Sequence, residues 1–445
     1  MTAKIAPIPR PDGASKFVIQ MTEWDHAGPT QNPDLKNLSF RDNLPAQRVA
    51  NELRSRVDIR EGYQGLEINT TSYVGRVDVG PLRIAIQPKL AVKPLAQLLR
   101  YAYSLRDIAI LEATRVPTAR HGLHDLFILM LAAEVEELVY RGLARQYVPL
   151  SESVENVRGR ILVDWIVRHG GIAEARVPCL YFERHVNWQL NQVLRAGLDA
   201  AAQMTEDSDL RRRAHRLAEM FGEVGRNTRV DLAEIDRAER GLTRLTAANR
   251  PALTLIRLLH EMQGVGIEAI EGSSRLPGFL FDMNIFFQRL LSRFLLENLT
   301  SARIEDQWAI RNVFAYALGN PGRRPAPVPR PDYALFRATK LCGFLDAKYR
   351  DIWKGGLPAE WLYQLSVYAL ASPSQISVLL YASMGAEARE ERVEVRKPVS
   401  WSGKPSASVS VRPVSLARMA ELLDPDHGST RSAERRRWAE DLVVL

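Results

Sequence analysis

The chain has 445 residues, of which 46% are hydrophobic and 25% charged, a composition typical of a globular protein with two or three domains. Sixty Lys and Arg residues against 52 Asp and Glu residues give a formal net charge of +8. This charge favours a polyanionic partner such as DNA, RNA or an anionic membrane, although many basic proteins bind none of these. The only two cysteines, Cys179 and Cys342, exclude a disulfide scaffold and a cysteine-rich zinc site, and they favour a reducing compartment.

The apolar segments of the chain predict no signal peptide and no membrane span. The first residues, MTAKIAPIPRPDG, contain no apolar core of a signal peptide. The longest apolar run, residues 126–133, is interrupted by Glu134 and Glu136 and is too short to cross a bilayer. We therefore expect a cytoplasmic protein without a membrane partner.

The periodicity of the apolar residues changes twice along the chain. Residues 1–95 alternate apolar and polar positions, most clearly over 66–90, where Gly75, Gly80 and Pro81 separate three or four expected strands. Residues 96–275 mainly follow the helical period of 3.6. Residues 276–445 mix both patterns. We expect a multidomain α+β protein with a β-rich N-terminal domain (1–95), a mainly helical middle domain (96–275) and a C-terminal α/β domain (276–445).

The last of these domains contains a short series of elements around a hairpin. A proline-rich loop precedes the hairpin, and the segment near the C-terminus, HGSTRSAERRRWAED, is expected to be exposed and mobile. The expected elements are a helix near 281–299, a strand-like run at 308–318, the hairpin at 330–350, a helix at 361–371, strands at 376–382 and 408–413, and a helix at 415–423.

Three charges lie on the otherwise apolar hairpin RPDYALFRATKLCGFLDAKYR. Asp332 opens its first strand, and Asp346 and Lys348 lie inside its second. Residues two apart in a strand share a face, so Asp346 and Lys348 point the same way, while Leu345, Ala347 and Tyr349 point to the other face, where helices can pack. Asp332 can approach the same edge if the strands pair, but the turn has no diagnostic type that would fix the register.

These three residue types can together hydrolyse a phosphodiester. Two neighbouring carboxylates repel each other, and a divalent cation removes the conflict. Mg²⁺ favours one or two carboxylates, several waters and phosphate oxygens, and it stabilises charge on the phosphorus. A lysine ammonium can orient a water and stabilise the developing negative charge. Lysine is also rare here, with ten lysines against fifty arginines and none between Lys93 and Lys340.

The tripeptide alone is a weak signal. A second Asp-x-Lys, Asp34-Leu35-Lys36, lies in a polar loop with no apolar strand around it. The alternative interpretation of Asp346 and Lys348 is a surface ion pair on an edge strand. On the following helix, Gln364 and Tyr368 are four residues apart and share a face, from which they could contact DNA or steady the lysine.

Taken in order, Pro331-Asp332, Asp346-Ala347-Lys348 and Gln364-x-x-x-Tyr368 resemble the PD-(D/E)xK nuclease superfamily and its Q-x-x-x-Y branch. The longer segments FLFDMNIFFQRLL, RPDYAL, LDAKYR and YQLSVYA resemble McrC, the nuclease subunit of McrBC systems that restrict DNA containing 5-methylcytosine. Upstream, YVGRVDVGPLRIAIQPKL, VRGRI and YFERHVNWQLNQVL are similar to the same family, so the resemblance covers about residues 60 to 425.

The resemblance implies a PD-(D/E)xK-type nuclease domain with a central mixed sheet flanked by helices. It also implies a hexameric AAA+ partner, McrB, which hydrolyses GTP and moves double-stranded DNA containing modified cytosine, and it assigns docking in that ring to the N-terminal part. Carried over by motif, Asp332 and Asp346 become the Mg²⁺ ligands, Lys348 the catalytic lysine, and Gln364 and Tyr368 further site residues. GTP belongs to the partner, because this chain has no G-x-x-x-x-G-K-[ST] motif.

One position departs from the family. Gln288 stands where the family usually has a glutamate, and a glutamine cannot supply the same anionic metal contact. Either Asp282 or water then fills that role, or the glutamate is dispensable. Three functions therefore stay open: a Mg²⁺-dependent endonuclease subunit, a recombination- or repair-type nuclease, and an adaptor with an inert nuclease domain that activates an AAA+ GTPase.

Overall fold

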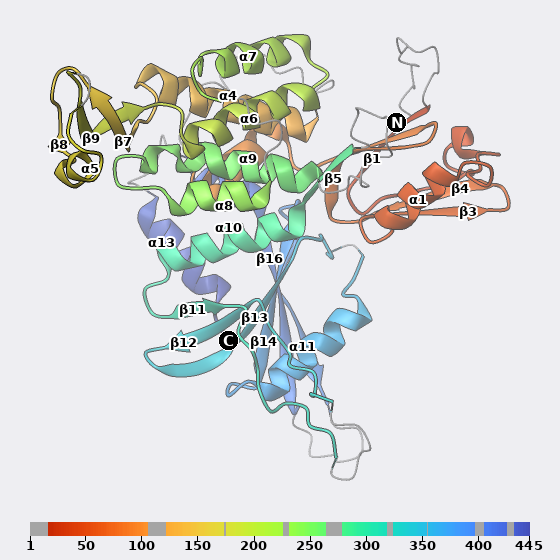
Figure 1. Ribbon diagram of the computed structural model, residues 1–445. Helices are drawn as coiled ribbons and strands as arrows, with labels where there is room; N and C mark the ends of the chain where they lie inside the picture. Colours follow the sequence, from red (N-terminus) through yellow and green to blue (C-terminus); the bar gives the residue numbers. More distant parts are fainter. Residues whose placement is uncertain are drawn as a thin grey trace. The chain divides into compact units, whose positions relative to one another are not determined.

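The computed structural model describes residues 17–105, 122–172, 175–225, 231–263, 278–317, 324–353, 355–396, 405–424 and 431–445. Figure 1 shows the chain as helices and strands, which divide into two compact units. Unit 1 combines Met1–Asp107 with Val265–Leu445, and unit 2 is Ile108–Gly264. The β-rich range 1–95 and the range 276–445 thus fall in one unit, and the division into three domains stays a prediction.

Unit 1 begins with a four-stranded sheet that joins its two sequence segments. Its order is β1-β6-β5-β10, with β1 parallel to β6 and the other pairs antiparallel. Gly75 has φ +139°, and a Cβ there would lie 2.2 Å from the carbonyl oxygen of Phe279, so only glycine lets β5 and β10 approach in this way. The strands are β1 (Phe17–Thr22), β5 (Tyr73–Val79), β6 (Leu82–Gln87) and β10 (Gly278–Asp282).

A second, three-stranded sheet with the order β2-β4-β3 also belongs to the N-terminal part of unit 1. Together with β5 and β6, its strand β4 confirms the three strands expected over 66–90. The elements are β2 (His26–Ala27), η1 (Pro33–Leu35), α1 (Leu44–Leu53), β3 (Val57–Gly62), β4 (Gly65–Thr70) and α2 (Val92–Tyr103).

The C-terminal part of unit 1 contains a six-stranded mixed sheet of order β11-β12-β13-β14-β16-β15. β13, β14 and β16 run parallel, and β11, β12 and β15 pair antiparallel at the two sides. The near-continuous burial of β14 is typical of a central parallel strand. The strands are β11 (Arg303–Asp306), β12 (Tyr333–Arg337), β13 (Lys340–Lys348), β14 (Ile376–Ser383), β15 (Glu391–Val395) and β16 (Ala407–Ser415).

Helices cover both faces of this sheet. α10 (Met283–Asn298) places Phe287 against Tyr349, with ring centroids 6.1 Å apart. On the opposite face, α11 (Ala359–Ala371) places Tyr368 near Phe344, with centroids 6.5 Å apart. The expected mixed sheet flanked by helices is therefore present, as are the expected helices and the strands around 376 and 408.

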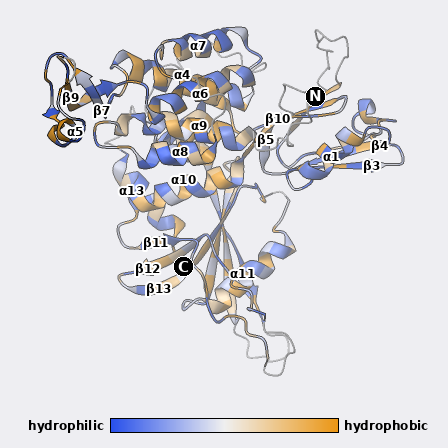
Figure 2. Cartoon of the chain, viewed as in Figure 1, coloured by the Kyte–Doolittle hydropathy of each residue, from blue (hydrophilic) through white to orange (hydrophobic). Residues whose placement is uncertain are grey.

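Unit 2 is mainly helical, as expected, but it includes a small sheet of order β7-β9-β8. Its helices alternate hydrophobic and hydrophilic residues along their lengths (Figure 2), and α7 buries Leu210, Ala214 and Leu217 on one face. The elements are α4 (Leu123–Tyr140), β7 (Gln146–Val154), β8 (Arg160–Ile161), α5 (Val163–Arg168), β9 (Val177–His185), α6 (Gln189–Met204), α7 (Ser208–Glu219), α8 (Leu232–Arg240), η2 (Ala247–Asn249) and α9 (Arg250–Gln263).

The strand expected at 308–318 is wrong over its described residues, 308–317, which form no strand. Gln307 and Asn312 have φ angles of 53° and 63°, and the left-handed conformation breaks an extended run. The strand of this region is β11, which ends one residue before Gln307. The backbone N–H of Ile310 instead donates to the carbonyl of Pro329, 2.9 Å away, so the segment packs against the proline-rich loop.

The prediction of an exposed, mobile C-terminal segment is also wrong in its described part. Residues Ser432–Leu442 form α13, which buries Trp438, Ala439 and Leu442, and α12 (Leu416–Leu422) precedes it. Glu440 accepts hydrogen bonds from the backbone N–H groups of Thr300 (2.8 Å) and Ser301 (2.9 Å). Burial would raise the pKa of Glu440, but these bonds and those of the two hydroxyls lower it to about 2.

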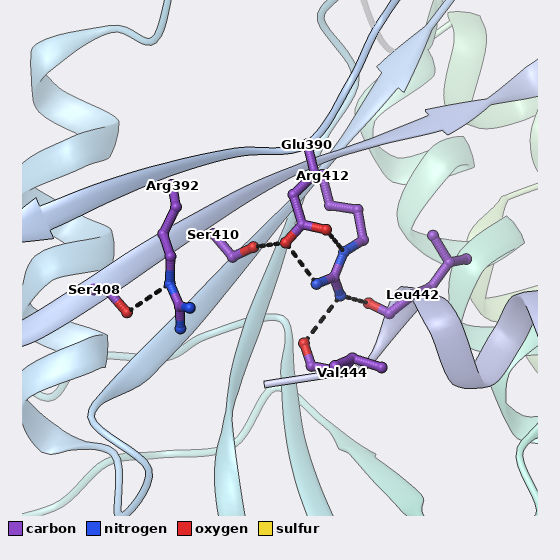
Figure 3. Close-up of polar contacts among 7 residues, drawn as sticks. All are labelled: Glu390, Arg392, Ser408, Ser410, Arg412, Leu442 and Val444. Carbon is purple, nitrogen blue, oxygen red and sulfur yellow. Dashed lines mark hydrogen bonds and ion pairs between the residues drawn. The ribbon is translucent and has the colours of Figure 1, made fainter.

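Arg412 of β16 holds the end of the chain in place (Figure 3). Its Nη1 donates to the carbonyls of Leu442 (2.8 Å) and Val444 (3.1 Å), and its Nε and Nη2 pair with Glu390. Ser410 donates to the same carboxylate.

Among the described residues, no helix is both long and apolar enough to cross a membrane.

We expect Arg412→Met to destabilise unit 1 by about 1–3 kcal/mol, because the buried carbonyl of Leu442 and the partly buried carbonyl of Val444 lose their charged donor. Arg392→Met is the matched control, since exposed Arg392 makes a single 3.2 Å bond to Ser408 Oγ, and it should cost about 0.5 kcal/mol or less. Urea unfolding of both variants measures the difference. Equal losses would show that Arg412 does not anchor the C-terminus.

Candidate active site

The pairing of β12 with β13 brings the two aspartates together. Tyr333 lies opposite Leu345 in this antiparallel pair, so the next step of the register sets Asp332 opposite Asp346. A register shift between Leu335 and Phe336 and a left-handed Ala338 (φ 52°) in the turn produce this alignment. Neither feature has a sequence signal, which is why the register could not be predicted.

The site lies in the middle of the sheet. β13 has β12 on one side and β14 on the other, and Asp346 is only 2% exposed. The alternative interpretation, a surface ion pair on an edge strand, is therefore wrong. Burial of two carboxylates, one in β13 and one immediately before β12, needs a compensating partner, because desolvation of a charge is costly.

Three N–H donors orient the carboxylate of Asp332. The backbone N–H of Ala347 donates to Oδ2 at 2.8 Å. The side-chain amides of Gln288 and Gln307 donate to Oδ1 at 3.0 and 3.2 Å. Burial raises the pKa of Asp332, and these three donors and the Lys348 charge partly oppose the shift.

Asp346 has a different environment. Its Oδ2 lies 2.6 Å from Nζ of Lys348, whose side chain is 22% exposed. Among the described residues, this oxygen has no hydrogen-bond partner other than that ion pair. Burial and the negative charge of Asp332 raise the pKa of Asp346 to about 6, although Lys348 opposes the shift. The lysine thus neutralises only part of the buried negative charge.

This donor set fits a divalent cation. Two convergent buried carboxylates with raised pKa values are the arrangement that a cation relieves. Within the part of the chain that the structure describes, no group of three or more His, Cys, Asp or Glu could hold a metal ion. Asp332 and Asp346 would therefore leave most ligand positions to water and substrate, which is the preference of Mg²⁺ and not of structural zinc.

Gln364 and Tyr368 lie on the face of β13 that carries Asp346. Gln364 Nε2 donates to the hydroxyl of Tyr368 at 2.7 Å, so the two residues form a pair, as their spacing predicted. Tyr368 is buried and Gln364 exposed. Burial and the charges of Asp346 and Asp332 raise the pKa of Tyr368 to about 12, with Gln364 opposing, which places the tyrosine close to the carboxylates.

Sequence reasoning missed Gln307 and reached Gln288 only as a departure from a family pattern. Gln307 follows β11, and both its backbone N–H and its side chain donate to Asp332. No motif marks it. Asp282 instead caps α10, accepting from the backbone N–H of Asn284 at 2.8 Å, so this role accounts for its carboxylate.

Comparisons with known proteins agree with this architecture. A sequence model of the family described as McrBC 5-methylcytosine restriction system component matches residues 68–382, more than half of the chain. No curated protein matches.

Solved structures also match this chain. A chain from the refined half-complex of Thermococcus gammatolerans McrB AAA+ hexamers with bound McrC has a TM-score of 0.61 and 20% identity; the match covers 96% of this chain and 100% of that chain. A chain from the cryo-EM structure of the Thermococcus gammatolerans McrBC complex has a TM-score of 0.46 and 21% identity, over 64% of this chain and 88% of that chain. On the family match over residues 68–382, the chain belongs to the McrBC 5-methylcytosine restriction system component family.

Proposed function

We propose that this chain is the McrC-type subunit of an McrBC-like restriction and antiviral defence system, and that it is a Mg²⁺-dependent DNA endonuclease of the PD-(D/E)xK type. Its substrate would be double-stranded DNA containing modified cytosine, moved by an McrB-like hexameric AAA+ GTPase whose GTP hydrolysis the chain stimulates. The observation that carries the proposal is the convergence of Asp332, Asp346 and Lys348 on one buried edge of the β12–β13 hairpin.

Each of these side chains has a distinct task. Asp332 and Asp346 would hold the cation, with Asp332 turned by its three donors so that Oδ2, which accepts only one of them, keeps a lone pair for a ligand. When bound, Mg²⁺ supplies positive charge that stabilises the phosphorane-like transition state and makes water a better nucleophile. Lys348 is a compact, partly exposed cation, which suits it to orient a water and to stabilise negative charge beside a phosphate.

The Gln364–Tyr368 pair would support the site from α11. Tyr368 is too buried to meet DNA itself, whereas Gln364 is exposed and is held by the tyrosine hydroxyl. We therefore assign Gln364 to the DNA backbone and Tyr368 to orienting it. The amide of glutamine can donate to a phosphate oxygen without adding charge.

The family match supports a protein partner, and the surface offers contact sites for one. Tyr63, at the tip of the β3–β4 hairpin, is fully exposed, in the N-terminal part that we assign to ring docking. Unit 2 exposes apolar side chains around its small sheet and α5, a composition typical of protein interaction surfaces. They are Val157, Ile161, Val163, Trp165, Val167 and Phe182.

We expect Asp346→Ala to lower cleavage of 5-methylcytosine DNA by about 10²–10³-fold or more, because the transition-state charge loses its support. The reaction contains the cognate AAA+ GTPase, GTP and Mg²⁺, and GTP hydrolysis is measured alongside. Stimulation of the GTPase should persist. Asp34→Ala, at an exposed residue of η1, is the matched control and should cleave normally.

The wild-type protein decides between the competing functions in the same assay. Cleavage that needs the GTPase supports the proposal. Cleavage without any GTPase would favour a recombination- or repair-type nuclease. GTPase stimulation without cleavage would favour an adaptor with an inert nuclease domain.

We expect Asp346→Asn to raise the melting temperature at pH 7.5 without divalent cations, by ~2 °C or more. The folded-state pKa of Asp346, about 6, lies above the unfolded value, so the folded protein loses stability as pH rises through that range. The neutral amide removes this loss, and the gap should shrink at pH 5. Adding Mg²⁺ should raise the melting temperature of the wild type and much less that of the variant. Equal Mg²⁺ shifts would contradict a cation at Asp346.

Gln288→Glu tests the position that departs from the family. The substitution removes the 3.0 Å donor to Asp332 and adds a third carboxylate, so without cations the variant should melt at least ~2 °C below the wild type. Mg²⁺ should reduce this deficit, because it offsets the added charge. Thermal unfolding with and without Mg²⁺ measures both effects, and an unchanged melting temperature would mean that Gln288 does not hold Asp332.

A further inference from the structure

Tyr349 follows Lys348 in the chain, and residues outside the six-stranded sheet bind all of its polar groups. Its backbone N–H donates to Oδ1 of Asn284 at 3.0 Å. Its carbonyl accepts from the indole N–H of Trp24 at 2.9 Å, and its hydroxyl donates to Oε1 of Glu23 at 3.1 Å. Two of these three partners belong to the N-terminal segment that follows β1.

These bonds act where β13 lacks a strand on one side. The pairing with β14 continues to Lys348, but the pairing with β12 ends at Leu345. The carboxylate of Asp332 takes the N–H of Ala347 in place of a strand. On that side, two sets of bonds therefore fix the backbone around Lys348: the bond of Ala347 to Asp332, and the backbone bonds of Tyr349 to Asn284 and Trp24.

The acceptor for the tyrosine hydroxyl is a specific, buried group. Glu23 is 0% exposed, and the backbone N–H of Lys89 donates to both of its oxygens, at 2.7 and 2.9 Å. Lys89 follows β6, so the four-stranded sheet and the segment after β1 hold this carboxylate between them. Burial raises the pKa of Glu23, which means that keeping an acid here costs stability.

The geometry explains how a change at Tyr349 reaches the site. Tyr349 directly follows Lys348, so the bonds that hold the backbone N–H and carbonyl of Tyr349 also restrict the backbone that carries the Lys348 side chain. The Lys348 ammonium is 2.6 Å from Asp346 and its side chain is partly exposed, so its position depends strongly on the direction of the backbone that carries it. The ring of Tyr349 packs against Phe287 of α10. Packing fixes where the ring lies, and the hydrogen bond to Glu23 fixes the orientation of the hydroxyl.

We propose that Tyr349, held by Glu23 and Trp24, is a positioning residue for Lys348, through which the N-terminal part of unit 1 sets the rate of the nuclease site. The inference rests on the proposed nuclease function and adds to it a route from the N-terminal part to the chemistry. It assigns no contact with DNA to Tyr349.

The test compares Tyr349→Phe and Trp24→Phe with the wild type in the full protein–GTPase–DNA assay. Tyr349→Phe keeps the ring and loses the hydroxyl bond to Glu23, and Trp24→Phe keeps an aromatic side chain and loses the indole N–H bond to the Tyr349 carbonyl. We expect kcat for cleavage to fall about tenfold in each, with KM for DNA and GTPase stimulation within twofold of the wild type. Tyr140→Phe, at an exposed tyrosine of α4 to which we assign no role, is the matched control and should leave all three values unchanged.

Two further measurements separate positioning from a general loss of structure. Glu23→Gln keeps an acceptor for the tyrosine hydroxyl, so it should retain kcat within about threefold of the wild type. The double variant Tyr349→Phe/Trp24→Phe should lose less than the product of the single losses, because both act on one residue. If Tyr349→Phe does not fold, Trp24→Phe and Glu23→Gln carry the comparison.

The outcomes are distinct. No cleavage by the wild type would overturn the proposed function and this inference with it. Cleavage by the wild type with unchanged kcat in Tyr349→Phe and Trp24→Phe would overturn the inference alone. A rise in KM, or a parallel loss of GTPase stimulation, would also overturn it, because either would indicate lost binding or folding instead of misplaced chemistry.

Discussion

The structure around the hairpin depends on the burial of two facing carboxylates in the middle of a sheet. Asp332 and Asp346 repel each other there, and the ammonium of Lys348 offsets only part of the charge. The remaining compensation comes from N–H donors on separate segments: Ala347 on β13, Gln288 on α10 and Gln307 after β11. α10 and the turn after β11 therefore each supply a donor to one carboxylate, in addition to the apolar packing of α10.

The N-terminal sheet is joined to this arrangement through two routes. β10 completes the N-terminal sheet and leads directly into α10, which carries Gln288 to Asp332. Glu23 and Trp24 bind Tyr349 at the end of β13. Through these two routes, the N-terminal part is connected to Asp332 and to the end of β13 that carries Asp346. These contacts agree with the assignment of 1–107 and 265–445 to one compact unit.

Local patterns predicted what local physics controls. A period of two placed Asp346 and Lys348 on one face, and a period of 3.6 located α10 and α11. The alternation at 308–317 was misleading, because left-handed Gln307 and Asn312 interrupt it. The many charges near the C-terminus led to the wrong prediction of an exposed segment, because the burial of Trp438 and its neighbours depends on residues distant in sequence. Contacts such as Glu23 with Tyr349, 326 residues apart, have no local signal at all.

Gln288 limits the negative charge beside Asp332. A glutamate at this position would add a third negative charge beside Asp332, and it could not donate to Oδ1 when ionised. The glutamine donates instead, so it orients Asp332 without deepening the repulsion. Two carboxylates and one ammonium leave a net charge of about −1, which a single divalent cation more than balances. For the cation that we propose, Asp332 and Asp346 would leave the rest of the ligand sphere to water and phosphate.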